Sequence, residues 1–289
     1  FKMEKISYIF YRLLKIFDLF LEKLFKKSFL IYFNDFFNKD FYETRNIKNK
    51  KINFFIPNAV TKWRVNTLFD KEPETIEWID NFKNINNEPI IFWDIGSNIG
   101  LYSIYAASIH KHIKIYSFEP STSNLRILSR NISINNLSDK ISIAQFPLSK
   151  KNFQFSEMNE QEFKEGWSMN TYGKPTDYEG KEFKPLQKYK ILGLSIDYLV
   201  ESNILETPNY IKIDVDGIED EILAGGIKSL TNQNLKSISI ELNKNYESQY
   251  KNVINIMDKI KLKFKHKKHA HIYENDKRFS ELFNYVFER

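Results

Sequence analysis

Two glycines and an acidic residue follow a short apolar run in the pattern of a ligand-binding turn. The run Ile90–Trp93 is typical of a strand buried on both faces, and Asp94, Gly96 and Gly100 come directly after it. Residues 101–109 then carry apolar side chains at helical spacing. A strand, a glycine turn and a helix N-terminus form the ligand-binding unit of doubly wound α/β proteins, because glycine lets the backbone approach a ligand and the helix offers free N–H groups.

The spacing of this turn, Asp-x-Gly-x-x-x-Gly, differs from the Gly-x-Gly-x-x-Gly of dinucleotide sites. Asn98 stands where a glycine would make room for a pyrophosphate, and Asp94 would repel one. A carboxylate here favours a ligand with a cationic end, such as S-adenosylmethionine, whose carboxylate also suits the helix N-terminus. For this turn alone, a strand–turn–helix without any ligand is an equally open alternative.

A second acid follows at the position expected for binding a ribose. Residues 114–120 alternate as a strand and end in Glu119 and Pro120, about twenty residues beyond the glycine turn, where an acid hydrogen-bonds a ribose diol. Pro120 stops the strand, and residues up to Asn124 can cap the next helix. The alternative is a solvated carboxylate after a strand. Taken with Asp94 and the glycines, Glu119 predicts a ligand of the nucleoside type.

The composition is that of a globular protein with one large or two modest domains. The 289 residues are 42% hydrophobic and 28% charged, with a net charge of +6 and no cysteine. Disulfides and thiolate metal sites are therefore excluded. Acidic residues are interspersed with the lysines, so no nucleic-acid surface is predicted. No calcium loop is predicted and no metal ligand is assigned, since Asp214-x-Asp216-Gly217 lacks the spacing of an EF-hand.

The first 45 residues predict an amphipathic helical appendage, followed by a second domain over 46–289. One helical stripe carries Ile6, Ile9, Phe10, Leu13, Phe17, Phe20 and Leu24. Charged residues recur too often for a spanning helix, which needs about twenty apolar residues, and no small-residue cleavage site follows. We therefore expect a cytoplasmic protein.

Two roles stay open for this appendage. In one, it packs on the main domain or joins the subunits of a homo-oligomer. In the other, it rests as a basic amphipathic helix on the inner face of an anionic membrane. The first is favoured, because large apolar stripes are usually buried.

Further apolar runs predict more strands of the same sheet, at 141–146, 210–213 and 237–241. Pro147 follows the first of these runs, where folds of this kind close over an adenine. Asp214 and Glu241 end the other two, as Asp94 and Glu119 end the earlier strands. Because C-terminal strand ends of an open α/β sheet face one crevice, these four acids predict a site for a cationic ligand or a metal.

The connecting segments are less regular. Residues 46–51 are polar and basic and predict a linker, and Pro73 predicts the start of a helix. Residues 150–190 predict hairpins and a loop over the site, since loops of this length are usually functional or disordered. The alternation in 261–265 predicts an edge strand guarded by lysines, and 283–287 predicts a closing strand.

In order and spacing, several blocks resemble the FkbM-type methyltransferase family over roughly residues 50–289. They are Phe92–Gly100, Phe118–Pro120, Leu194–Asp197, Ile211–Glu219 and Ile238–Glu241. The resemblance implies a doubly wound α/β, Rossmann-like methyltransferase sheet with helices on both faces. It further implies S-adenosylmethionine-dependent O-methylation of a hydroxyl on a small-molecule or glycan acceptor, such as a sugar, a glycolipid or a polyketide. Asp216 departs from the Glu usual in the family, and Asn243 from a frequent His.

The expected contacts of the cofactor are Asp94, Gly96, Ser97, Asn98, Gly100, Tyr102, Glu119, Pro120, Asn124, Pro147 and Asp214. A hydroxyl must lose its proton during transfer, and Asp214 is the first candidate base, with Glu241 and Glu219 after it. Binding the methionine amino group is an equally open role for Asp214, and a divalent metal could instead acidify the hydroxyl. Candidates for holding the acceptor are Trp63, Arg64, Trp167 and Asp216.

Two rival classes of function remain. An NAD-dependent oxidoreductase would need the central glycine that Asn98 replaces, and no hydride-transfer residue is evident. The other rival is a membrane-associated or oligomerising binding module with a methyltransferase fold and no activity. All four predicted strands around the crevice are followed by an acid, and this complete set argues against a module that has lost its chemistry.

Overall fold

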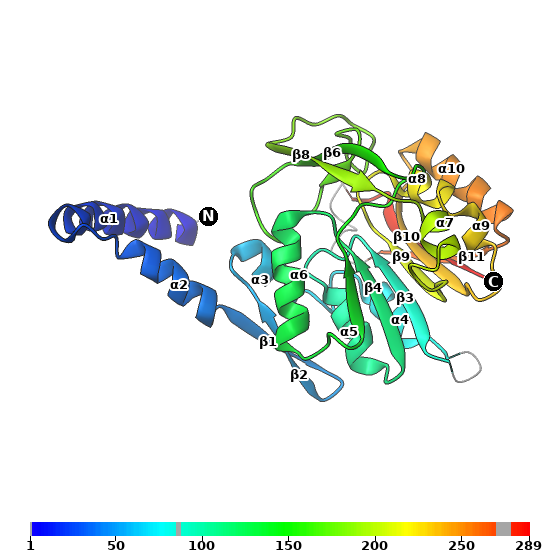
Figure 1. Ribbon diagram of the computed structural model, residues 1–289, viewed down its shortest axis with the longest axis horizontal. Coiled ribbons are helices and arrows are strands. Elements are labelled where there is room, and N and C mark those ends of the chain that lie inside the picture. Colours follow the sequence, from blue (N-terminus) through cyan, green and yellow to red (C-terminus); the bar gives the residue numbers. More distant parts are fainter. Residues whose placement is uncertain (1, 85–87, 270–278) are drawn as a thin grey trace. The chain divides into compact units, whose positions relative to one another are not determined.

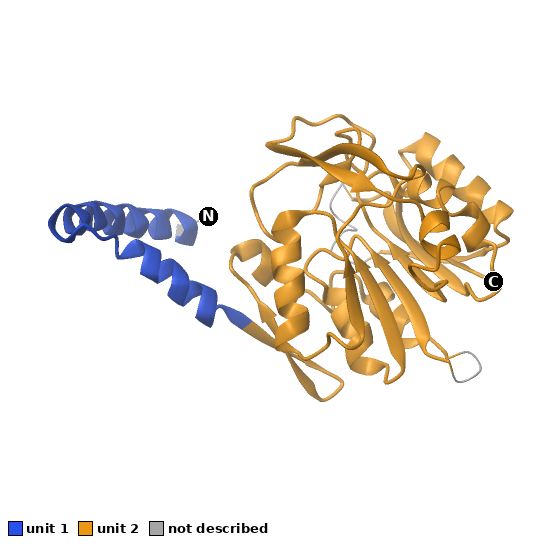
Figure 2. Ribbon diagram, in the orientation of Figure 1, with its two compact units in different colours: residues 1–42 blue, residues 43–289 orange. Residues whose placement is uncertain are grey.

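The computed structural model of the protein describes residues 2–84, 88–269 and 279–289. The chain forms two compact units, residues 1–42 and residues 43–289 (Figure 2). The boundary lies slightly before the one predicted between residues 45 and 46. The first unit is helical, and the second contains the sheets (Figure 1).

Helices α1 (Lys2–Phe25) and α2 (Leu30–Asp40) make up the first unit. The buried carboxylate of Asp18 caps the start of α2, since it accepts hydrogen bonds from the Ser28 hydroxyl and the Phe29 N–H, both at 2.7 Å. Most apolar side chains of the two helices are exposed. No helix among the described residues is both long enough and apolar enough to cross a bilayer.

A seven-stranded sheet in the order β11-β12-β10-β9-β3-β4-β5 forms the centre of the second unit (Figure 1). Its strands are β3 (Ile90–Ile95), β4 (Ile113–Phe118), β5 (Ile141–Ala144), β9 (Tyr210–Ile213), β10 (Ser237–Asn243), β11 (Lys263–Lys268) and β12 (Leu282–Glu288). Strands β5, β4, β3, β9 and β10 are parallel, and β12 is antiparallel to both of its neighbours. The strand order reverses between β3 and β9, and such switch points are where open α/β sheets bind ligands.

Helices cover both faces of this sheet (Figure 1). Trp93 and Ile95 face the core shared with α7 (Ile196–Glu201), α8 (Glu219–Ala224), α9 (Ile227–Leu230) and α10 (Glu247–Lys259). Phe92 points the other way, toward Trp78 of α4 (Pro73–Asp80), because successive side chains of a strand alternate. Helices α3 (Ala59–Asn66), α5 (Leu101–Ile109) and α6 (Thr122–Ile134) complete the unit. Apolar residues on both faces explain the continuous apolar run at 90–93.

Residues 46–51 are not a linker, and that prediction is wrong. Strands β1 (Tyr42–Ile47) and β2 (Lys50–Phe55) form a two-stranded sheet, and the two residues between them, Lys48 and Asn49, both have positive φ. Such a pair makes the tight turn that matches the twist of two strands. Ile47 and Ile52 are buried, and this burial holds the polar stretch in place.

The predicted hairpins of residues 150–190 form a separate three-stranded sheet. It consists of β6 (Gln154–Glu160), β7 (Thr171–Tyr172) and β8 (Gln187–Gly193), in the order β7-β6-β8. Met158 and Tyr172 of this sheet line the cavity described below. The segment therefore lies beside the site.

The predicted doubly wound α/β fold class, with a helical segment before it, is confirmed. The helix expected at Pro73 begins at that residue, and β11 lies at the edge of the sheet. The strand expected at 283–287 is β12, which is inserted between β10 and β11. Its place in the sheet could not be read from local pattern, because strand order is a tertiary property.

Candidate active site

A cavity of about 390 Å³ opens at the C-terminal ends of β3, β4, β9 and β10. Predicted site residues that line it are Trp63, Arg64, Gly96, Asn98, Glu119, Pro120, Asn124, Pro147, Trp167, Asp214, Asp216 and Glu241. Predicted site residues that do not line it are Asp94, Ser97, Gly100, Tyr102 and Glu219. The structure thus brings most residues predicted to bind the cofactor or the acceptor to one cavity. The others do not line it.

The glycine turn packs against the neighbouring strand β9. Gly96 has a φ of +84°, and a Cβ placed on it would lie 1.8 Å from the carbonyl oxygen of Asp214. Only glycine fits so close an approach. Gly100, with a φ of +86°, precedes α5, and a Cβ there would lie 2.5 Å from a methyl carbon of Leu128 in α6. The two glycines therefore let the turn pack between β9 and α6.

Glu119, just after β4, is held by backbone donors. Its Oε2 accepts the N–H of Asn98 and its Oε1 accepts the N–H of Ser121, both at 2.8 Å. Burial raises the pKa of Glu119 to about 8, and these hydrogen bonds offset only part of that effect. Because a carboxylate has about four acceptor positions, Glu119 can accept further hydrogen bonds from a ligand in the cavity.

Asp94 lies behind the wall of the cavity, with none of its surface exposed. Its position in β3 turns it toward α5, where its Oδ2 accepts a hydrogen bond from the Ser103 hydroxyl at 2.6 Å. Its neighbour in β9 is Lys212. Burial raises the pKa of Asp94, although the charge of Lys212 opposes this shift. The side chain therefore faces the helix, and the cofactor contact expected of Asp94 stays a prediction.

Lys212 links acids from separate segments. Its ammonium lies 2.7 Å from Oδ2 of Asp214 and 3.8 Å from Oε2 of Glu72, and it faces the ring of Tyr102 at 4.9 Å. The side chain is 1% exposed. Burial alone would lower the pKa of Lys212, but Asp214, Glu72 and Asp94 raise it above its usual value. A charged lysine is thus enclosed by carboxylates beside the cavity.

Glu72 was not among the predicted site residues. It precedes α4 and is 2% exposed, with its Oε1 2.8 Å from the ammonium of Lys71, which lines the cavity. Burial opposes ionisation of Glu72, but Lys71 and Lys212 outweigh it and hold the pKa at about 2. Lys212 lies within a block that resembles the FkbM family. Nothing in the sequence places residues 71 and 72 next to Asp214.

The acids on this side of the cavity repel one another. Burial, together with the charges of Asp214 and Glu72, raises the pKa of Glu241 well above its usual value. Burial and Asp214 raise the pKa of Asp216 to about 6. Carboxylate oxygens of Glu72, Asp214 and Glu241 all lie within 4.8 Å of one another, close enough to hold a metal ion. Lys212 and Lys71 already supply positive charge to this group.

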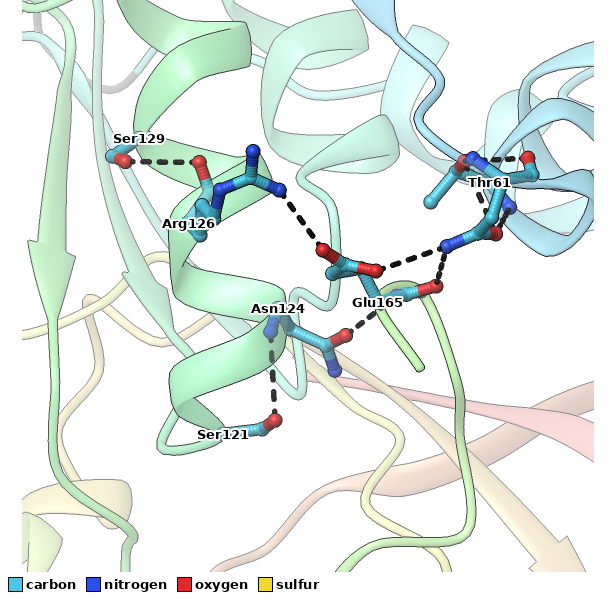
Figure 3. A network of polar contacts seen from close by, with 8 residues as sticks. Thr61, Ser121, Asn124, Arg126, Ser129 and Glu165 are labelled. Atoms are coloured by element: carbon cyan, nitrogen blue, oxygen red, sulfur yellow. Dashed lines mark hydrogen bonds and ion pairs between the residues drawn. The ribbon is translucent and has the colours of Figure 1, made fainter. Parts of the chain in front are cut away.

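Residues 165–170, called the strap below, form one wall of the cavity. Glu165 anchors its start: the Asn58 amide donates to the Glu165 carbonyl at 3.0 Å, and Arg126 of α6 lies 2.9 Å from the Glu165 carboxylate (Figure 3). The side-chain oxygen of Asn124 accepts the N–H of Gly166 at 2.8 Å. The strap is therefore tied to α6 and to the start of α3.

The remainder of the strap is tied to the strand ends. The Asn98 amide donates to the carbonyl of Trp167 at 3.0 Å, and the N–H of Met169 donates to Asp216 at 2.7 Å. Asn98, Met169 and Asp216 all have positive φ without being glycine. Backbone strain of this kind clusters at functional sites, where the surrounding structure holds it. These contacts fix the strap over the ends of β3 and β9.

Two polar atoms of the strap are buried and have no hydrogen-bond partner in the described parts of the chain. They are the indole Nε1 of Trp167, a donor, and the side-chain Oδ1 of Asn170, an acceptor. Both residues line the cavity. Because buried polar atoms are normally satisfied, this pair fits a ligand that carries both donors and acceptors, such as a polyol.

Glu219 holds the turn after β9 in place. Its carboxylate accepts the N–H of Gly217 at 3.1 Å and the side-chain amide of Gln249 at 2.6 Å. Burial raises its pKa to about 8. Glu219 is 3% exposed and lies outside the cavity wall, so its contacts are those of a positioning residue. The geometry leaves Asp214 and Glu241 as the candidate bases that reach the cavity.

Fold and site together define a doubly wound α/β protein with a cavity at the switch point of its sheet. The model of the methyltransferase FkbM domain family matches residues 94–274, which is more than half of the chain. The protein therefore belongs to the FkbM methyltransferase family, as the resemblance of the sequence blocks predicts. No curated protein matches the chain in sequence.

Solved structures of methyltransferases are similar to the chain at low identity. The methyltransferase FkbM from Methylobacillus flagellatus is 13% identical, with 80% of this chain and 53% of that chain covered and a TM-score of 0.49. A putative rRNA methylase from Clostridium thermocellum is 9% identical, with 76% and 95% covered and a TM-score of 0.44. TYW2 from P. horikoshii, in complex with MeSAdo, is 10% identical, with 86% and 70% covered and a TM-score of 0.44. The chain spans about half the length of the first of these.

Proposed function

We propose that the protein transfers a methyl group from S-adenosylmethionine to a hydroxyl of a sugar, glycan or glycolipid. Membership of the FkbM family supports methyl transfer. The observation that carries the cofactor assignment is Glu119, which lines the cavity with both carboxylate oxygens fixed by backbone N–H groups. A fixed acid at the end of the second strand is suited to a ribose diol.

The residues on the cofactor side fit a nucleoside with a charged tail. Gly96 and Asn98 line the cavity next to Glu119, and Pro147 lies on the far side of β4, where an adenine would pack. Asp214 lies where an amino group could replace part of its contact with Lys212. When bound, S-adenosylmethionine supplies a methyl group that is already activated by its sulfonium.

The acceptor side fits a polyhydroxylated molecule. Trp63 and Trp167 offer aromatic faces, and the unpartnered atoms of Trp167 and Asn170 offer one donor and one acceptor to hydroxyls. Asp214 keeps its carboxylate beside Lys212 and can take the proton of an acceptor hydroxyl, with Glu241 as the second candidate. The strap forms one wall on this side of the cavity, and a wall that shields the bound acceptor from water favours transfer over hydrolysis.

Calorimetric titration of the purified protein with S-adenosylmethionine and with NAD tests the cofactor. We expect binding of S-adenosylmethionine, weakened at least tenfold by Glu119→Ala, because hydrogen bonds to a charged group are each worth about 1.5–3 kcal/mol. The exposed residue Glu162 provides a matched control, Glu162→Ala, which should bind as the parent does. Thermal unfolding of each variant checks that it is folded.

Four results would contradict the proposal. Parent affinity in folded Glu119→Ala would remove the ribose assignment. Preferential binding of NAD would favour an oxidoreductase, and binding of neither ligand would favour a module without activity. Transfer of a labelled methyl group to a panel of free sugars, nucleotide sugars and glycolipids then identifies the acceptor, and transfer only to non-hydroxyl atoms would overturn O-methylation.

A further inference from the structure

The first unit carries a wide apolar surface along α1. At 3.6 residues per turn, the apolar side chains of α1 fill about half of the helix circumference. We call this surface the apolar arc; its exposed members are Ile6, Ile9, Phe10, Leu13, Leu14, Ile16, Phe17, Phe20, Leu24 and Phe25. Phe10 and Phe20 are each 61% exposed. A surface of this width in contact with water marks an interaction site.

Charged residues border the apolar arc in an ordered way. Lys5, Arg12 and Lys23 share one border of the arc and form what we call the basic edge. Glu4, Glu22 and Asp18 lie along the opposite border, where Asp18 is occupied in capping α2 and Lys15 lies next to the two glutamates. The polar face therefore extends along the whole of α1, so that α1 can lie flat on a surface with its axis parallel to it.

Helix α2 adds aromatic residues to the same unit. Phe29, Phe33 and Phe37 contact one another in series, with ring centroids 5.3 Å and 6.1 Å apart, and Phe29 contacts Phe17 of α1 at 5.7 Å. Phe33 and Phe37 stay exposed in spite of these contacts. The two helices thus do not bury their own apolar side chains.

The width of the apolar arc and the charges around it indicate what binds to this surface. A seam with a second helix uses about two positions in seven, much less than half of the circumference. Residues 1–42 contain eight Lys and Arg and five Asp and Glu, and two of the lysines, Lys26 and Lys27, lie between the helices. Lysines at the border of an apolar face lay their stems on it and place their charges at the level of lipid phosphates. Both features favour an anionic bilayer over a second copy of the chain.

We propose that residues 1–42 bind the surface of an anionic phospholipid bilayer. The apolar arc enters the boundary between headgroups and acyl chains, and the basic edge, with Lys26 and Lys27, contacts the phosphates. Each basic residue near such a surface strengthens binding about fivefold. This anchoring is independent of the chemistry in the second unit and would keep the cavity close to a membrane.

Sedimentation of the 289-residue protein with vesicles tests this proposal. We expect the protein to sediment with phosphatidylcholine vesicles that contain phosphatidylglycerol and to bind pure phosphatidylcholine far more weakly. Phe10→Ser combined with Phe20→Ser should abolish sedimentation. Replacing the basic edge, as Lys5→Ser, Arg12→Ser and Lys23→Ser together, should weaken binding to the mixed vesicles about 100-fold.

A matched control removes the same charge from the second unit. Lys111, Lys228 and Lys244 are exposed there, and their joint replacement by serine should leave vesicle binding unchanged. Equal weakening by this control would show that net charge alone attracts the protein and would overturn the proposal. A protein that stays in the supernatant with mixed vesicles, or a dimer that Phe10→Ser with Phe20→Ser dissociates and that ignores vesicles, would overturn it as well.

Discussion

At the end of β4 the carboxylate of Glu119 is held by backbone N–H groups, whereas at the end of β9 that of Asp214 is held by the ammonium of Lys212. Both acids line the same cavity. The cofactor side therefore owes its polarity to the main chain. The acceptor side owes its polarity to charged side chains from β9, β10 and the segment before α4.

Because the two sides of the cavity hold their acids in different ways, they should respond differently to substitutions of side chains. Backbone donors stay in place whatever the neighbouring side chains are, so the cofactor side depends on the turn and its glycines. A buried lysine among Glu72, Asp214 and Asp94 is different, because its removal takes a positive charge from all three carboxylates and leaves Lys71 as the remaining cation on Glu72. Removing side chains should thus harm the acceptor side more than the cofactor side.

The largest effect is expected from Lys212→Met. This change keeps most of the length of the side chain and leaves the buried Glu72 and the partly buried Asp214 without their shared cation, so the free energy of unfolding should fall by about 3–5 kcal/mol. Lys114→Met is the control, since Lys114 also lies 2.7 Å from a carboxylate, that of Glu206, but both partners are about half exposed. Its cost should stay below about 1 kcal/mol.

Urea unfolding of the two variants and the parent gives these energies. A Lys212→Met protein no less stable than Lys114→Met would mean that the acids beside Lys212 do not depend on its charge. The two sides of the cavity would then not differ in how far they depend on side-chain charge.

A smaller effect, on rate, should separate the two candidate bases. Asp214→Asn keeps the shape of the side chain and should lower kcat about 100-fold with the acceptor found in the labelled-methyl assay, as expected for loss of a general base. Glu241→Gln should lower kcat less, because burial and neighbouring charges raise the pKa of Glu241 and favour its protonated form. A larger decrease in kcat for Glu241→Gln than for Asp214→Asn would indicate that Glu241, and not Asp214, is the general base.

The smallest effect concerns the cofactor side and its response to pH. Each oxygen of Glu119 accepts one N–H, so a proton on the carboxyl removes an acceptor that a ribose hydroxyl needs. A ribose therefore binds the ionised form, and with a pKa of about 8 for Glu119 the affinity should rise about tenfold from pH 7 to pH 9 and level off above.

The neutral probe 5′-methylthioadenosine isolates this effect, because it has the ribose and lacks a titrating amino group. Its affinity should be measured by calorimetry across this pH range for the parent and for Glu119→Gln, which cannot ionise. A rise of the same size in Glu119→Gln would assign the titration to another group.

Local patterns in the sequence predicted the strand, the glycine turn and the acid that meet at one part of the cavity. The apolar run at 90–93, Gly96, and Glu119 after its strand predict the parallel sheet and the cavity, because strand, turn and helix are adjacent in the chain. Pro73 predicts the start of α4 for the same reason, since its fixed φ acts on its own residue. For such features the physical cause is local.

Only the tertiary structure determined which residues meet at the proposed acceptor side of the cavity and in which direction each acid faces. Glu72 reaches Lys212 across 140 positions of sequence, and the strap meets Asp216 only because the separate sheet β7-β6-β8 folds beside the cavity. Asp94 lies within β3, one residue before its end at Ile95, and faces α5 because the alternation of β3 directs it away from the cavity. Local pattern identifies which residues end a strand; the packing of the neighbouring elements determines which of them meet a ligand, because burial and counter-charges come from residues distant in the chain.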